Sequence, residues 1–244
     1  MNTDKLSVRL TTVAKYVPEG ARLADIGSDH AYLPCYLAKN LKISYAIAGE
    51  VAKGPFQSAE KNVLTEGLAD KITVRMGDGL EVIQSGEVDC ITIAGMGGAL
   101  ISSILENGKD KLGSVKRLVL QPNISAFSIR TWLFENHWEL LAEEILEEDG
   151  KIYEILIAEQ GDPVKPYQEK KEREFLLGPF LLKEKNEIFK KKWDLEMKNW
   201  QRIVEAMEGA SETAETIEKK NELIEKIKLV EEVLSNDNEE SERS

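Results

Sequence analysis

The sequence predicts an α/β fold in which a seven-stranded sheet is followed by a C-terminal α-helical coiled-coil hairpin. From residue 21 to residue 158, short apolar runs alternate with longer segments of helical period, which is typical of a sheet covered by helices. Beyond residue 161, apolar residues recur only at helical spacing. We therefore expect a sheet domain over residues 1–160 and a helical domain over residues 161–244.

Five expected strands alternate with helices, and two more form a hairpin. The strands are expected at residues 22–26, 45–48, 72–76, 90–94 and 117–120, and the helices at 32–39, 56–65, 80–83, 100–106 and 126–136. The hairpin is expected from residues 138–146 and 152–158 around the turn Glu148, Asp149 and Gly150. An amphipathic helix from Leu6 to about Val17 precedes the first strand and is ended by Pro18 and Gly20.

Two apolar faces of helical period predict the coiled-coil hairpin of roughly 55 residues. The first face consists of Phe189, Trp193, Trp200, Ile203 and Met207, and the second of Ile217, Ile224, Ile227, Val230 and Leu234. Gly209, Ala210 and Ser211 interrupt the pattern, so the two helices are expected to be antiparallel. The polar tail from Ser235 onward is expected to be disordered.

Composition indicates a soluble globular protein of the cytoplasm. Hydrophobic residues make up 42% of the chain and charged residues 31%, which excludes collagen-like and broadly disordered classes. Cys35 and Cys90 belong to no CxxC pair, so neither a disulfide framework nor a thiolate zinc site is expected. The apolar stretch from residue 88 to 105 is not expected to cross a membrane, because Asp89 and three glycines interrupt it.

Charge is distributed unevenly along the chain. The net charge of −12 argues weakly against a large nucleic-acid surface, because binding phosphates needs clustered Lys and Arg. Residues 165–202 nevertheless hold 11 basic and 7 acidic side chains, whereas residues 203–244 hold 5 basic and 13 acidic ones. The negative charge is therefore concentrated at the end of the chain.

The segment LADIGSDHAYLP, residues 23–34, begins like a nucleotide-binding loop and then departs from that pattern. Gly27 follows the first strand, but Asp29 and Ala31 stand where a dinucleotide site has two more glycines. Pro34 belongs in the first turn of a helix, so the crossover loop is short and its backbone N–H groups are expected to point beyond the strand. Asp29 would repel a pyrophosphate and favours a cationic or zwitterionic ligand such as S-adenosylmethionine; a plain strand-to-helix turn is the alternative.

Acidic residues also follow the next two strands. Glu50 comes about 20 residues after the first loop, where a carboxylate can accept hydrogen bonds from both ribose hydroxyls. Asp78 follows the third strand and is placed to receive an adenine amino group. Either residue alone is equally expected on an ordinary turn. Acidic side chains at the ends of three successive strands together favour a nucleoside cofactor.

The fourth and fifth strands end in AGMGGAL and LQPN. Gly95, Gly97 and Gly98 allow close backbone approach where the reacting groups would meet, although a flexible connection would have the same composition. The Asn or Asp, two prolines and aromatic residue that many exocyclic-amine methyltransferases place here are absent, which favours a ring nitrogen as the methyl acceptor. Gln121 and Asn123 are candidates to bind a base edge, but are also ordinary near a turn.

These motifs together resemble the bacterial tRNA (adenine-N1)-methyltransferases that act at position 22 of tRNA. The resemblance rests on DIGSDHAYLP, AGE, GDGL, AGMGG and LQPN, and it extends over the whole chain. It implies a class I Rossmann-like methyltransferase that uses S-adenosylmethionine, with a C-terminal coiled coil that helps to hold tRNA. By position it implies that Asp25, Gly27, Glu50, Asp78, Gly79 and Gly95 bind the cofactor, and that Asp29 and His30 face the transferred methyl group.

The expected catalytic residues are accordingly Asp29 and His30. The expected cofactor site comprises Asp25, Gly27, Ser28, Asp29, His30, Glu50, Val51, Asp78, Gly79, Gly95, Met96 and Gly97, and the expected substrate contacts are Tyr32, Gln121 and Asn123. We expect tRNA as partner, no metal, no membrane and a monomer. Two other functions remain open: a methyltransferase of the same fold acting on another RNA, a protein or a small molecule, and a non-catalytic adaptor whose helical hairpin binds a protein.

The resemblance also suggests a mechanism. Adenine N1 is nucleophilic without prior deprotonation, because its lone pair lies in the ring plane. Methylation leaves a cationic purine, which a carboxylate at Asp29, accepting from the 6-amino group, is expected to stabilise. The base must be unpaired or extruded before it can react, and Met96 and Tyr32 are candidates for the surface on which it stacks.

Overall fold

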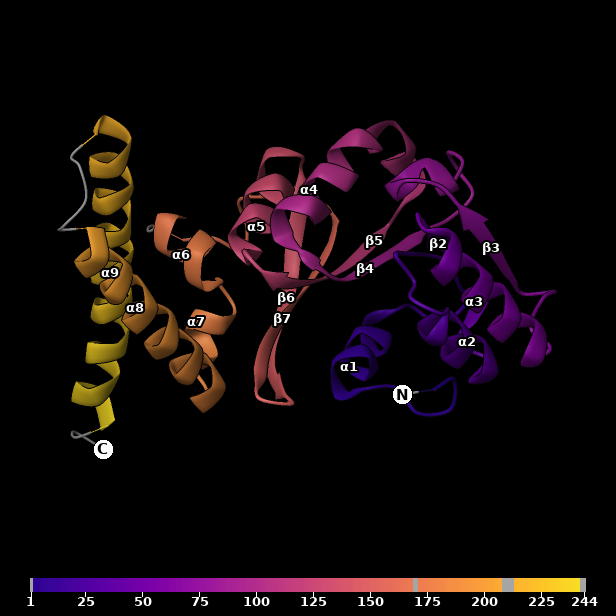
Figure 1. Ribbon diagram of the computed structural model, residues 1–244, viewed down its shortest axis with the longest axis horizontal. Coiled ribbons are helices and arrows are strands. Elements are labelled where there is room, and N and C mark those ends of the chain that lie inside the picture. The colour runs from indigo at the N-terminus through magenta and orange to yellow at the C-terminus, as the bar shows by residue number, and fades with distance from the viewer. Residues whose placement is uncertain (1, 169–170, 208–212, 242–244) are drawn as a thin grey trace. The chain divides into compact units, whose positions relative to one another are not determined.

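The computed structural model describes residues 2–168, 171–207 and 213–241 (Figure 1). The chain divides into two compact units, Met1–Leu182 and Lys183–Ser244. Residues 161–182 therefore group with the sheet, whereas the sequence analysis assigned them to the helical domain.

The first unit alternates strands and helices as the sequence predicts. Its strands are β1 (Ala21–Ile26), β2 (Ile43–Glu50), β3 (Ile72–Met76), β4 (Cys90–Gly97), β5 (Arg117–Ile124), β6 (Trp138–Glu148) and β7 (Lys151–Gln160). Its helices are α1 (Val8–Tyr16), α2 (Tyr32–Lys39), α3 (Lys53–Thr65), the 3-10 helix η1 (Gly79–Val82), α4 (Gly98–Asn107), the 3-10 helix η2 (Lys109–Ser114), α5 (Ala126–Glu135) and α6 (Lys171–Leu177), with α7 (Leu181–Glu184) at the boundary.

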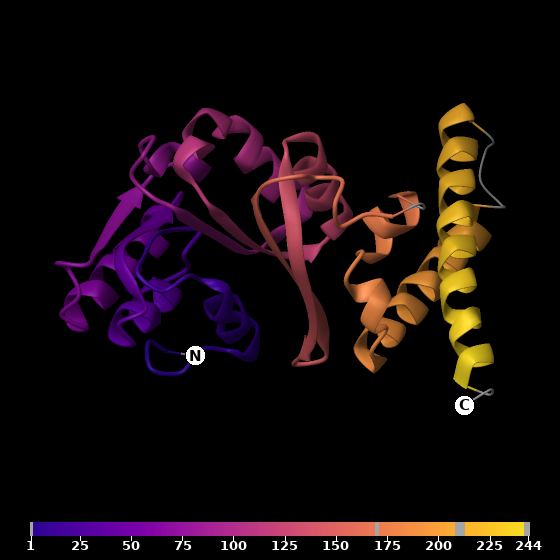
Figure 2. The ribbon, with the colours of Figure 1, turned by 180° about the vertical axis from the view of Figure 1, so that it is seen from behind.

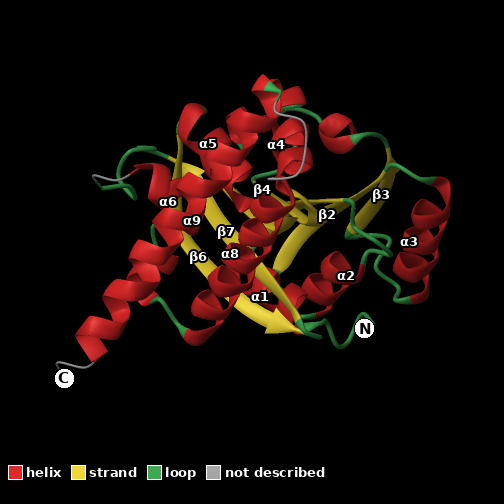
Figure 3. Ribbon diagram, turned by 60° about the vertical axis from the view of Figure 1, so that its left-hand side comes forward, coloured by secondary structure: helices red, strands yellow, loops and turns green. Residues whose placement is uncertain are grey.

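The seven strands form one sheet in the order β3-β2-β1-β4-β5-β7-β6, which confirms the predicted fold class (Figure 3). Strands β1 to β5 pair in parallel, and β7 lies antiparallel to both β5 and β6. From β1 the chain adds β2 and then β3 on one side of β1. It then crosses back and adds β4 and β5 on the other side. Open α/β sheets bind ligands at such a switch point, which here lies beyond the carboxyl ends of β1 and β4.

Helices cover both faces of the sheet. Helices α1, α2 and α3 lie on one face and α4 and α5 on the other (Figures 1 and 2). In β1, Leu23 packs into the core under the first set and Ala24 into the core under the second, because successive strand residues point to opposite faces. Because helices cover both faces, the sequences of the parallel strands are nearly continuous apolar runs.

Strands β4 and β5 continue beyond their predicted ends. β4 runs to Gly97 instead of residue 94, and its register to β5 shifts on both sides of Met96. Gly95 and Gly97 thus belong to an irregular strand end. Gly98 then begins α4, where a Cβ atom would lie 2.0 Å from the backbone oxygen of Ser125, so only glycine fits.

A buried ion cluster ties residues 161–182 to the sheet. Arg130 is fully buried, and its guanidinium bonds to the carboxylates of Glu143 at 2.6 Å and Glu154 at 2.7 Å. The same guanidinium donates to the carbonyl oxygens of Phe175 and Leu176 in α6, both at 3.1 Å. These bonds connect α6 to the strands that carry the two glutamates. Removing either glutamate would leave the buried guanidinium incompletely paired, which is costly.

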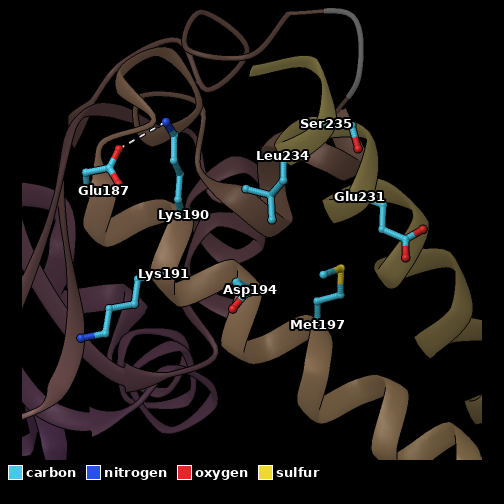
Figure 4. Close-up of a pocket in the computed structure, with 8 residues that line it drawn as sticks. All are labelled: Glu187, Lys190, Lys191, Asp194, Met197, Glu231, Leu234 and Ser235. Carbon is cyan, nitrogen blue, oxygen red and sulfur yellow. Dashed lines mark hydrogen bonds and ion pairs between the residues drawn. The ribbon is translucent and has the colours of Figure 1, made fainter. Parts of the chain in front are cut away.

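The second unit contains the predicted pair of long helices, α8 (Glu187–Met207) and α9 (Ala214–Ser241). Residues at the start of α8 and the end of α9 line one pocket of about 520 Å³, so the helices are antiparallel (Figure 4). The predicted break at residues 209–211 lies outside the described residues. α9 is helical to Ser241, past Ser235, where the sequence analysis placed the start of a disordered tail; residues 242–244 lie outside the description.

Candidate active site

The loop between β1 and α2 turns through an unusual run of backbone conformations. Gly27 has φ +67°. After Ser28, the three consecutive residues Asp29, His30 and Ala31 have φ of +45°, +70° and +57°. Positive φ is costly for residues with a Cβ atom, and such residues cluster at functional sites. Something in the surrounding structure must therefore hold this loop.

Asp25 provides that restraint. Its side chain is buried, and its two oxygens accept hydrogen bonds from the Ser28 hydroxyl at 2.5 Å and the Thr92 hydroxyl at 2.6 Å. Burial raises the pKa of Asp25; the two hydroxyl bonds oppose that shift and the nearby charge of Asp29 adds to it. Asp25 thus connects the loop to β4. The sequence analysis missed Thr92, although it is the polar residue within the apolar run of β4.

The backbone N–H groups of the loop are largely used inside the protein. Those of Gly27 and Ser28 donate to the carbonyl oxygen of Gly49, at 3.0 and 3.2 Å. The expectation that these groups point at a ligand is wrong for these two residues. Because an anion site at such a turn needs free N–H groups, the loop is poorly suited to a pyrophosphate.

Glu50 ends β2 and carries an unsatisfied buried oxygen. The residue is 5% exposed, and its Oε1 atom has no hydrogen-bond partner within the described part of the chain. Burial is the main cause that raises its pKa, the charges of Asp25 and Asp29 raise it further, and the Asp29 N–H and His30 lower it. A buried acceptor without a donor is costly, so this oxygen fits the hydroxyl of a bound ligand.

Asp78 lies at the end of β3 with an exposed side chain. Its backbone N–H donates to the Glu81 carboxylate at 3.1 Å at the start of η1. A Cβ atom on Gly79 would lie 3.0 Å from Ile104, and its φ is +52°, so packing and backbone geometry already require glycine there. Val51, directly after Glu50, is 69% exposed, which leaves an apolar side chain at the same edge.

Met96 connects the ends of β1 and β4. A Cβ atom built on Gly27 would lie 2.2 Å from Met96 Cε, so the methionine occupies the space that a side chain at position 27 would need. At Gly97 a Cβ atom would meet only Ile124, at an ordinary 3.8 Å. The missing side chain at Gly97 therefore leaves room for a ligand.

Gln121 lies behind the Gly95 loop and not on a surface that a base edge can reach. It is fully buried; its Oε1 accepts from the Gly95 N–H at 3.0 Å and from the Arg9 guanidinium, and its Nε2 donates to the Pro122 carbonyl at 2.8 Å. The predicted substrate contact at Gln121 is a misreading of a residue that orients the loop. Asn123 is exposed and donates to the Gly95 carbonyl at 2.8 Å.

The remaining predicted residues lie together at the surface of the loop. The Asp29 side chain is 75% exposed, and its Oδ1 lies 3.5 Å from His30 Nε2. The His30 ring lies 5.4 Å from the Tyr32 ring, centroid to centroid. An exposed carboxylate, an imidazole and a phenol thus stand beside the buried Asp25 and Glu50.

Two other features are absent from the described residues. No group of three or more His, Cys, Asp or Glu side chains there could hold a metal ion. No helix in the same part of the chain is long and apolar enough to cross a membrane.

The strand order with an antiparallel β7, the loop at the switch point and the buried acid after β2 define a class I, Rossmann-like, S-adenosylmethionine-dependent methyltransferase. The family model described as tRNA (adenine(22)-N(1))-methyltransferase matches residues 23–232. The chain belongs to this family and is a tRNA (adenine(22)-N(1))-methyltransferase.

Relatives agree along nearly the whole chain. The Bacillus subtilis enzyme of that name is 55% identical over 235 residues, covering 96% of this chain and 99% of the relative, and its crystal structure matches with a TM-score of 0.90 at 54% identity, covering 95% and 99% of the two chains. The Streptococcus pneumoniae protein Sp1610, in complex with S-adenosyl-L-methionine, matches at 44% identity and TM-score 0.78, covering 94% and 100%. The M. capricolum protein TrmK, in complex with S-adenosylhomocysteine, matches at 28% identity and TM-score 0.79, covering 94% and 99%.

The raised pKa of Glu50 predicts opposite effects of Glu50→Gln on stability and on ligand binding. A carboxyl whose pKa is raised in the folded state stabilises the fold below its ordinary pKa, and this contribution is lost as pH rises through the raised value. At pH 7 the neutral amide should therefore raise the melting temperature of the ligand-free protein by about 2–4 °C for each kcal/mol gained. S-adenosylmethionine binding, measured by calorimetry, should weaken.

Glu60, exposed on α3, supplies the matched control: Glu60→Gln should change neither quantity. The stabilisation by Glu50→Gln should vanish below the ordinary glutamate pKa, about 4.3. A melting temperature that falls at pH 7 would contradict this assignment of Glu50.

Proposed function

We propose that Glu50, Asp78 and the β1 and β4 loops hold S-adenosylmethionine, and that Asp29 faces the adenine N1 acceptor in tRNA. The unsatisfied Glu50 Oε1 atom carries this proposal, because a ribose offers two hydroxyl donors and adenosyl cofactors present a ribose at this position of the fold. Exposed Asp78 suits the adenine amino group. Gly95, which is exposed and has no side chain, leaves room for the methionine portion.

The reaction needs little acid–base chemistry from the protein. Bound S-adenosylmethionine supplies an electrophilic methyl group on a sulfonium. No side chain has to remove a proton, since adenine N1 attacks with its in-plane lone pair. The protein's task is to orient the base and to stabilise the positive charge that the purine acquires. The exposed Asp29 carboxylate can accept from the 6-amino group, and His30, within 3.5 Å, limits its orientation.

The base has to leave its helix or loop before it can react. Extruded bases are stacked against apolar or aromatic surfaces. Met96, half-buried against Gly27, and Tyr32, half-buried beside His30, offer such surfaces near Asp29. We assign both residues to base stacking.

Asp29→Asn tests the role of charge at this carboxylate. Asparagine keeps the shape and one acceptor oxygen but removes the negative charge, so turnover should fall by about a hundredfold while S-adenosylmethionine affinity stays within about twofold, as is common when a charge-stabilising group is lost. Turnover is read from 1-methyladenosine formed in tRNA, and affinity from calorimetry. Equal losses in turnover and cofactor affinity would reduce Asp29 to a cofactor contact.

The helical unit is proposed to contact tRNA through α8. Three consecutive lysines, Lys190 to Lys192, lie on α8, with Lys198 and Arg202 further along, whereas α9 carries far more acidic than basic residues. Figure 4 shows Lys190 and Lys191 extending from the first turns of α8. Phosphate binding depends on such clusters of positive charge. We further propose a monomer that works in the cytoplasm, where the two free, buried cysteines remain reduced.

A matched pair of triple variants tests the choice of helix. Replacing Lys190, Lys191 and Lys192 by Gln should weaken tRNA binding and reduce the salt dependence of that binding, because fewer counterions are released. Replacing Lys219, Lys226 and Lys228 of α9 by Gln should have little effect. Filter binding over a range of salt concentrations gives both quantities. An equal loss for the two variants would contradict the assignment to α8.

A further inference from the structure

Arg9, in the first turn of α1, contacts the active-site loop from a distant part of the sequence. Its guanidinium bonds to the buried Gln121 Oε1, and a Cβ atom built on Gly95 would lie 3.7 Å from Arg9 Nη1. The guanidinium carbon lies 5.3 Å from the centre of the Tyr153 ring, and Arg9 is half-buried. Arg9 therefore lies against the exposed Gly95 backbone, at the carboxyl end of β4.

The Arg9 guanidinium is not part of an ion pair among the described residues. Within the described part of the chain, no side-chain carboxylate lies in ion-pair range of the guanidinium; Glu148 accepts instead from the backbone N–H of Arg9, at 3.3 Å. A guanidinium has five N–H donors, and the bond to Gln121 is made by one nitrogen, Nη1. Donors thus remain for an anion that approaches over Gly95.

The other charged side chains of the proposed site, apart from His30, are acidic. The negative charges of Asp25, Asp29, Glu50 and Asp78 favour the positive charges of S-adenosylmethionine, but they would repel its α-carboxylate. The carboxylate therefore needs a cation of its own. Arg9 meets that need beside Gly95, where a missing side chain lets a ligand approach.

We propose that Arg9 binds the α-carboxylate of S-adenosylmethionine, with Gln121 holding the guanidinium in place. The assignment rests on the proposed position of the cofactor over the β1 and β4 loops. Arg–carboxylate pairing is charge-assisted and can use two parallel N–H bonds, so it also orients the methionine portion and hence the methyl group.

Calorimetric binding of two ligands to purified full-length protein tests this. The ligands are S-adenosylmethionine and decarboxylated S-adenosylmethionine, which lacks only the carboxylate. The wild-type protein should prefer the complete cofactor. Arg9→Ala should weaken binding of S-adenosylmethionine by about ten- to hundredfold, the range for a hydrogen bond to a charged group, and leave the decarboxylated ligand nearly unchanged. Arg9→Lys should restore part of the loss.

Lys116→Ala is the matched control, because it removes one positive charge from an exposed residue at the amino end of β5, away from the site. Equal loss of both ligands in Arg9→Ala would mean that Arg9 only supports the Gln121 and Gly95 loop. If Arg9→Ala binds the cofactor as the wild type does but binds tRNA more weakly and with less salt dependence, the guanidinium contacts an RNA phosphate. Either result overturns the proposal.

Two further outcomes separate this proposal from the proposed function. If Arg9→Ala does not fold, wild-type protein that binds both ligands equally would still contradict a carboxylate contact. If wild-type protein binds neither ligand, the proposed cofactor site itself fails, whatever Arg9 does.

Discussion

The buried carboxylate of Asp25 is the constraint on which the active site depends. Its bonds to Ser28 and Thr92 fix the first loop to β4, and they support three consecutive non-glycine residues at positive φ. This geometry leaves the Asp29 carboxylate exposed. Both oxygens of Asp25 are used inside the protein, and the residue thus acts by fixing the position of Asp29.

The same loop explains why an α/β fold of this kind takes a sulfonium cofactor in place of a dinucleotide. The N–H groups of Gly27 and Ser28 are used inside the protein, which removes the anion-binding turn of dinucleotide sites. Acidic side chains after β1, β2 and β3 add a field that favours positive charge. Arg9 supplies a positive charge beside Gly95, where the cofactor's carboxylate is proposed to lie. Selection between cofactors is therefore electrostatic as much as steric.

Sequence periodicity was sufficient for the fold and for the residues at strand ends. Helix α2 begins and ends at the predicted residues because Pro34 belongs in a first turn, and the five parallel strands follow from their apolar runs. Glu50 was found because a parallel sheet brings the carboxyl ends of its strands to one edge. Local pattern and tertiary structure agree wherever the signal lies within one strand–loop–helix unit.

Contacts between distant segments could not be predicted in this way. Arg9 and Gln121 are 112 residues apart, and Asp25 and Thr92 are 67 apart, so no spacing in the sequence relates them. Gln121 looked like a turn residue although it is fully buried. The Arg130 cluster, which joins residues 161–182 to the sheet, consists of charged residues that ordinarily lie on surfaces. A single sequence carries no sign that these charges are buried.

The most direct test of the account is a pair of crystal structures, one without ligand and one with S-adenosylhomocysteine. If Asp25 holds a preformed loop, Asp29, His30 and Ala31 should keep positive φ in both structures, and the ribose hydroxyls should lie within hydrogen-bond distance of Glu50 Oε1. A loop that changes conformation on binding, or a Glu50 oxygen still without a donor in the complex, would contradict the central role given to Asp25.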